Sequence, residues 1–126
     1  MSDFLRSRAD AFKYAFSGWW YVIRTQRNAW IHAVASVLVI AVSIYLQLDR
    51  YDWVFIFIAI AFVWTAEFLN TAIELVVDLS IQEHHPLAKA SKDVGAATVL
   101  IAAITAAIIG VIILGPPLLE KLQRMF

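Results

Sequence analysis

The segment WVFIFIAIAFVWTAEFLNTAIELVVDL, from Trp53 to Leu79, decides the fold of this chain. As a helix it would measure about 40 Å at 1.5 Å per residue, whereas the apolar core of a bilayer is about 30 Å thick. Its first half is uncharged, but its second half carries polar residues that are rare in a helix that only anchors a protein, namely Glu67, Asn70, Glu74 and Asp78. We therefore predict a membrane-spanning helix whose polar end projects into water.

Two further apolar segments flank this one. The first covers residues 29–48 and is interrupted only by His32 near its start. The other covers residues 94–114, is rich in Ala and Ile, and precedes Gly115-Pro116-Pro117, a sequence that predicts the end of a helix. We expect an all-α integral membrane protein with one domain, residues 1–126, and transmembrane helices over about 29–48, 53–79 and 94–114.

The composition supports this class and excludes others. Hydrophobic residues make up 62% of the 126 residues and charged residues 16%, whereas a soluble domain has roughly half and a quarter. Ten Lys and Arg balance ten Asp and Glu, so no basic excess suggests a nucleic-acid partner. The chain has no cysteine, which excludes disulfides and thiolate metal sites.

The N-terminal segment, about residues 4–25, has the periodicity of an amphipathic helix. Arg6, Lys13 and Arg24 share one side, and the opposite arc is apolar, with Leu5, Phe12, Phe16, Trp19, Trp20 and Ile23. This pattern is typical of a helix that lies in the membrane interface, and binding of an anionic ligand by the basic side is the alternative.

The distribution of Lys and Arg predicts the topology. Seven of these residues lie before the first span or between the second and third, and three lie in the other connection and the C-terminal segment. Basic flanks stay on the cytoplasmic side, so we expect a multi-pass protein of the cell (inner) membrane with the N-terminus and the second loop in the cytoplasm.

The polar residues of the second span fall on one helical face, because they are three, four and four residues apart. Their oxygens are hard ligands, which favours Mg²⁺ over zinc or copper. Burial disfavours the charged form of the deepest carboxylate, Glu67, which suits it to accept a proton from a hydroxyl. Two alternatives remain open: pairing with basic residues between helices or subunits, and proton-coupled transport.

The following loop, residues 80–93, adds charged and imidazole side chains near the aqueous end of this face. Lys92 and Asp93 would suit phosphate and nucleotide contacts, although Lys92 could serve only the membrane orientation and Asp93 could cap the third helix. His84 and His85 could be ordinary loop residues. Only four glycines are present, so no glycine-rich loop can hold a triphosphate, and side chains with a metal would have to do so.

Three motifs make the sequence recognisable: Glu67-Phe-Leu-Asn-Thr-Ala-Ile-Glu-Leu-Val-Val-Asp78, then His85, then Ala90-Ser-Lys-Asp-Val-Gly-Ala-Ala97. Together they resemble the signature of the small prokaryotic diacylglycerol kinase and undecaprenol kinase family, over nearly the whole chain. The resemblance implies a three-span homotrimer with an amphipathic N-terminal helix. It also implies MgATP-dependent phosphorylation of a lipid alcohol, diacylglycerol or undecaprenol, at active sites shared between neighbouring subunits.

The resemblance also assigns roles by position. Glu67 matches the catalytic base and Asn70 a further polar residue near the substrate. Glu74 matches a Mg²⁺ and nucleotide ligand. The other nucleotide-contacting positions are Tyr14, Asp78, His84, His85, Lys92 and Asp93. His84 departs from the tyrosine that is common there. Gln26 stands where better-known members supply a second metal-binding glutamate. It offers a neutral oxygen without charge, so either the metal is held more loosely or another group such as Asp78 compensates.

Two other classes of protein, a transporter and a scaffold, are alternatives to a lipid kinase. A small proton-coupled multidrug transporter would exchange protons for cations at Glu67 and would have no use for Lys92 and Asp93. A non-enzymatic scaffold would use the polar face to hold helices together. A stripe of small residues on the third span, Ala102, Ala106 and Gly110 with Ala103 and Ala107, predicts a helix–helix interface between subunits.

Overall fold

The computed structural model describes residues 3–81 and 83–125, which form four helices and, within these ranges, no strand. These are α1 (Asp3–Thr25), α2 (Arg27–Leu46), α3 (Arg50–Ser80) and α4 (Pro86–Gln123). The last three are long and apolar enough to cross a membrane. The predictions of an all-α membrane fold with three spans and an additional N-terminal helix are confirmed.

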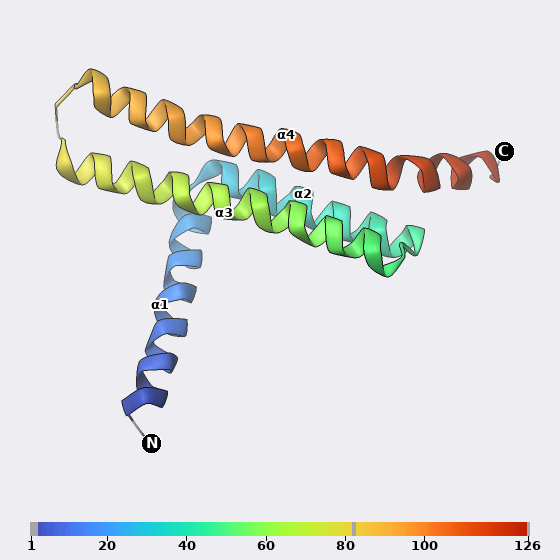
Figure 1. The fold of residues 1–126 in the computed structure, drawn as a ribbon, viewed down its shortest axis with the longest axis horizontal. Coiled ribbons are helices and arrows are strands. Elements are labelled where there is room, and N and C mark those ends of the chain that lie inside the picture. Colours follow the sequence, from blue (N-terminus) through green and yellow to red (C-terminus); the bar gives the residue numbers. More distant parts are fainter. Residues whose placement is uncertain (1–2, 82, 126) are drawn as a thin grey trace.

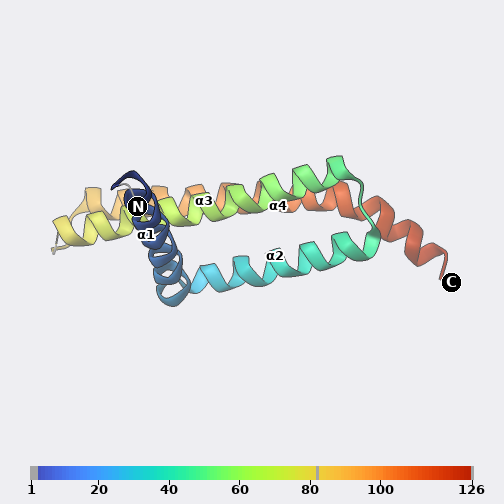
Figure 2. The same cartoon turned by 90° about the horizontal axis from the view of Figure 1, so that it is seen from below.

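The three spanning helices lie side by side, and α1 projects sideways from them (Figure 1). The most extensive packing is between α3 and α4, and α2 lies along one face of this pair and contacts both helices (Figure 2). Both views show the C-terminal part of α3 and the start of α4 extending together beyond the junction of α1 and α2. The polar end of α3 therefore stands clear of α2.

Local sequence explains where α2 and α3 begin and end. Gln26 has an extended backbone, with φ −97° and ψ 115°, and separates α1 from α2. Gln47 ends α2 in the left-handed region, with φ 55°. Asp49 caps α3, because its Oδ1 accepts hydrogen bonds from the backbone N–H groups of Tyr51 and Asp52, at 2.7 and 3.0 Å. The sequence prediction was within three residues at each of these ends.

The bounds of α4 differ from the prediction. The helix begins at Pro86, with His85 as its N-cap, because proline is well suited to the first helical position. Lys92 is thus not at the helix start, and Asp93 does not cap it. The helix also continues through Pro116 and Pro117 to Gln123, so the predicted end at this motif was wrong. Proline lacks the donor and clashes with the preceding turn, but neighbouring helices let spans tolerate it.

Small residues bring α3 and α4 close together. Val63 and Ala66 of α3 pack against Val99 and Ala102 of α4, and Ala106 extends this core by one turn. Ala102 is fully buried within the chain. Part of the stripe that predicted an interface between subunits thus serves close packing within one chain.

Aromatic contacts attach α1 to the bundle. The Trp19 ring stacks on Trp64 of α3, with ring centroids 5.0 Å apart, and lies 5.1 Å from Phe68. The indole N–H of Trp64 in turn donates a hydrogen bond of 3.2 Å to Ser36 Oγ of α2. Helix α1, the predicted surface helix, is therefore fixed at the level of residues 64–68 on α3, which is the level of Glu67.

Candidate active site

Glu67 is the most deeply buried charged residue of α3, with 1% of its side chain exposed. Two of its neighbours on the same helix, Ala66 and Asn70, are also buried, and Thr71 Oγ1 donates to the Glu67 carbonyl at 2.9 Å. Within the described residues, Glu67 Oε2 has no hydrogen-bond partner. An ionisable group that is buried without a partner is costly, so such groups are usually functional.

His32 faces Glu67 from α2. Its Nε2 lies 3.7 Å from Glu67 Oε2, beyond hydrogen-bond range, and the His32 side chain is 13% exposed. This contact was not predicted, because in the sequence His32 stands out only as an interruption of an apolar segment. The signal was nevertheless present, since a lone ionisable residue inside a span is a functional candidate by default.

Asn70 and Glu74 lie one and two turns after Glu67 on the same face. Asn70 Nδ2 donates to Glu74 Oε1 at 3.1 Å, while the buried Asn70 Oδ1 lacks a partner among the described residues. Gly95 of α4 permits this arrangement, because a Cβ atom at that position would overlap Asn70 Oδ1. The site therefore presents a carboxylate and a free amide oxygen at the boundary between α3 and α4.

Ion pairs link charged residues at the aqueous end of the site. Lys92 Nζ of α4 contacts Asp78 Oδ1 of α3 at 2.5 Å, and Lys89 Nζ contacts Asp93 Oδ2 at 2.6 Å. The structure thus brings Lys92 to the polar face of α3, about three turns beyond Glu67. These side chains are 40–80% exposed, so the pairs are accessible to a solute.

The remaining predicted site residues are not gathered around Glu67 by any contact. Tyr14 is 71% exposed on α1, and His84 is exposed in the loop before α4. Gln26 is half-buried at the junction of α1 and α2, and its side chain makes no capping hydrogen bond there. His85 has a structural role, because its Nδ1 accepts from Leu87 N at 3.2 Å.

The donor set at Glu74 is consistent with magnesium. The described residues contain no group of three or more His, Asp or Glu that could hold a metal ion together. Magnesium, however, is usually held by one or two protein carboxylates with substrate phosphates and water. Glu74 offers such a carboxylate, and the unpartnered oxygen of Asn70 lies beside it.

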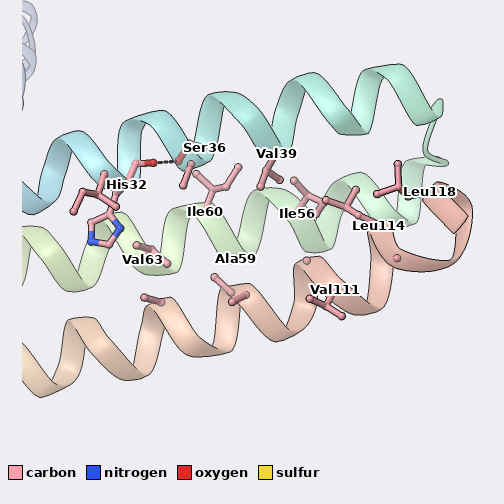
Figure 3. Close-up of a pocket in the computed structure, with 17 residues that line it drawn as sticks. His32, Ser36, Val39, Ile56, Ala59, Ile60, Val63, Val111, Leu114 and Leu118 are labelled. Carbon is pink, nitrogen blue, oxygen red and sulfur yellow. Dashed lines mark hydrogen bonds between the residues drawn. The ribbon is translucent and has the colours of Figure 1, made fainter. Parts of the chain in front are cut away.

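An apolar groove of about 590 Å³ runs between α2, α3 and α4, as Figure 3 shows. Its walls are aliphatic apart from His32 and Ser36, which lie toward one end. His32 projects from α2 toward α3 in this view. The side chain that faces Glu67 thus also forms part of the wall of an intramembrane groove.

The match to a family model covers most of these elements. Residues 13–114, from α1 to most of α4, match the model of prokaryotic diacylglycerol kinase. The chain belongs to this family. The resemblance seen in the sequence is thereby confirmed.

Named relatives are similar over most of the chain. An undecaprenol kinase of Bacillus subtilis is 42% identical over 86% of this chain and 88% of its own length. A diacylglycerol kinase of Synechocystis is 44% identical over 87% of this chain and 63% of its own length. A diacylglycerol kinase of Escherichia coli is 38% identical over 70% of this chain and 78% of its own. These relatives are all named lipid kinases, and none is named a transporter.

Proposed function

We propose that this protein is a lipid kinase that transfers the γ-phosphate of ATP, with Mg²⁺, to the hydroxyl of a membrane lipid alcohol. The substrate is diacylglycerol or undecaprenol. The observation that carries the proposal is Glu67, a buried carboxylate whose Oε2 has no partner among the described residues, at the level of the surface helix. The family and the named relatives support the same reaction class.

Glu67 is the proposed base. A lipid hydroxyl at headgroup depth would reach a carboxylate at the level of α1, whose apolar face suits burial in the headgroup region. Glu67 accepts the hydroxyl proton as the oxygen attacks the γ-phosphorus, and the bond between that phosphorus and the β,γ-bridging oxygen breaks, so that ADP leaves. Because this carboxylate is shielded from water, it is available to accept a proton from the lipid hydroxyl. Asn70 orients the substrate beside it.

The ATP phosphates would lie between Glu67 and the aqueous end of α3. Lys92 is the proposed counter-charge, and its exposed pair with Asp78 can be exchanged for phosphate at little cost, since such pairs are worth about 0–1 kcal/mol. The chemistry that Mg²⁺ supplies when bound is neutralisation of the phosphate charge. Glu74 and Gln26 would hold the Mg²⁺ ion. The other proposed nucleotide contacts are Tyr14, Asp78, His84, His85 and Asp93.

The proposal includes location and assembly. The basic residues before α2 and before the apolar part of α4 favour a cytoplasmic N-terminus and second loop in the cell membrane. This orientation places the polar end of α3 where ATP is available. We further propose a homotrimer with active sites shared between subunits, as the sequence resemblance implies. Mass measurement of the protein in mild detergent tests this assembly.

The function is tested by incubating the purified protein in lipid nanodiscs with MgATP and either diacylglycerol or undecaprenol. We expect a phosphorylated lipid with at least one of the two, and comparison of kcat/KM identifies the substrate. A parallel assay in sealed vesicles measures proton-coupled uptake of an organic cation. Cation uptake without any phosphorylated lipid would contradict the proposal and favour a transporter.

A further inference from the structure

The contact between His32 and Glu67 is not used in the phosphoryl transfer proposed for this protein. Two buried polar atoms, His32 Nε2 and Glu67 Oε2, face each other at 3.7 Å, and neither has a hydrogen-bond partner among the described residues. Leaving a buried polar group unpaired costs free energy, so one such atom is uncommon and two that face each other are more so. This pairing points to a shared role.

We propose that His32 is a positioning residue for Glu67. Its imidazole N–H donates to Glu67 Oε2 and thereby turns the other carboxylate oxygen toward the hydroxyl of the lipid. The inference rests on the proposed function, because Glu67 must be the base for its orientation to matter. It assigns a role to α2, which otherwise contributes no residue to the chemistry.

Only a small adjustment is needed to form this hydrogen bond. An N–H···O bond is about 2.9–3.0 Å long, so the two atoms must approach by less than 1 Å, which side-chain rotation can supply. Catalytic hydrogen bonds are often long before substrate is bound and shorten in the complex. His32 is partly exposed to the groove between α2, α3 and α4, so it has room to turn (Figure 3).

The backbone that carries His32 is held in place. Ser36 Oγ donates to the His32 carbonyl at 2.7 Å, which Figure 3 shows as a dashed line, and accepts from Trp64 Nε1 at 3.2 Å. Trp64 in turn stacks on Trp19 of the surface helix. The backbone of His32 is thus linked through Ser36 to Trp64 of α3, one turn before Glu67, while the imidazole ring remains free to rotate.

The first test compares three variants of the full chain in nanodiscs by steady-state kinetics. His32→Phe removes the donor but keeps a planar ring, and we expect kcat to fall about 10- to 100-fold with an unchanged KM for MgATP. This loss is smaller than the roughly 10²- to 10⁴-fold contributed by a general base, because Glu67 itself remains. His32→Gln keeps an N–H donor and should retain more activity than His32→Phe. Ser43→Ala removes a hydroxyl about three turns further along α2 that donates to the Val39 carbonyl of its own helix, and it should stay within about twofold of wild type.

A double-mutant cycle separates positioning from a merely structural role. If His32 acts through Glu67, His32→Phe should cause no further loss in a Glu67→Gln background. A role in packing would give additive losses in that background. Should His32→Phe fail to assemble, His32→Ala removes the donor without added volume, and the same cycle applies.

The outcomes are distinct. Wild-type transfer together with an unchanged rate in His32→Phe, or additive losses in the cycle, would overturn the role of His32 and leave the kinase proposal intact. Absence of lipid phosphorylation by the wild type would overturn both. Loss of rate in His32→Phe, partial retention in His32→Gln and no loss beyond Glu67→Gln would establish the positioning role.

Discussion

Two polar regions along α3 differ in how their charges are satisfied. Around Glu67 the carboxylate is buried, and its nearest ionisable neighbour, His32, stands 3.7 Å away without a hydrogen bond. About three turns further on, Asp78 is exposed and directly paired with Lys92 at 2.5 Å. The same helix therefore carries one site that is desolvated and unpaired and another that is solvated and paired.

Because of this difference, the two regions can take different tasks in a phosphoryl transfer, namely proton acceptance and phosphate binding. A buried, unpaired carboxylate is energetically costly and gains most from a proton, which suits a base. An exposed pair costs little to form or break, so it can exchange one partner for a phosphate group.

The largest effect is expected at the buried region. Glu67→Gln removes proton acceptance but replaces a buried carboxylate with a neutral amide, so the protein should still insert and assemble while the rate falls about 10²- to 10⁴-fold. Lipid phosphorylation by the purified variant gives the rate. Glu120→Gln, the same change on an exposed residue at the far end of α4, is the control. A wild-type rate in Glu67→Gln would remove this residue as the base.

The exposed region should respond differently. Lys92→Met removes a positive charge beside Asp78, and we expect kcat/KM for MgATP to fall about 10- to 100-fold, since hydrogen bonds to charged groups contribute about 1.5–3 kcal/mol. Lys89→Met removes a lysine that pairs with Asp93 and should have a much smaller effect. Equal losses in the two variants would indicate a general charge effect and not a phosphate contact.

The boundary between the regions depends on Gly95. Gly95→Ala places a methyl group on Asn70 Oδ1. We expect a loss of stability of about 1–3 kcal/mol, as for other overpacked sites, together with reduced activity. Gly115→Ala, on the same helix with open space around its Cβ position, is the matched control. Thermal unfolding in detergent gives the midpoint temperature of each variant. Equal midpoints for Gly95→Ala and Gly115→Ala would contradict the close approach of Gly95 to Asn70 Oδ1.

The smallest effect is expected at Gln26. If this residue is a metal ligand, Gln26→Glu adds charge and should lower the Mg²⁺ concentration for half-maximal rate by about two- to fivefold. Gln123→Glu makes the same change at the far end of the chain. If Gln26 instead faces solvent or a headgroup, the new carboxylate would only form exposed pairs with nearby arginines. Superimposable Mg²⁺ titrations for wild type and variant would then exclude it from the site.

The sequence predicted the fold well where hydrophobicity determines it. The three spans were located correctly, because apolar runs report the part of a helix that lies in lipid. They do not report the part that continues into water, and so the start of α4 at Pro86 was missed. The motif Gly115-Pro116-Pro117 was misjudged for a related reason, since a local rule for helix ends takes no account of neighbouring helices.

The site was predicted in part. Spacing along one helix placed Glu67, Asn70 and Glu74 on a shared face, and the structure shows a hydrogen bond between the last two. Contacts between helices could not be predicted in this way. His32 lies 35 positions before Glu67, and only the packing of α2 on α3 brings them together. The Lys92–Asp78 pair across α3 and α4 depends on packing in the same way.

The most direct test of the central claim follows the γ-phosphate of labelled ATP in a single turnover of the wild-type protein in nanodiscs. We expect the label to appear on the lipid, and a lipid of the same class with its hydroxyl blocked by methylation to receive none. Label released only as inorganic phosphate, or ATP left intact with both lipid alcohols, would contradict it.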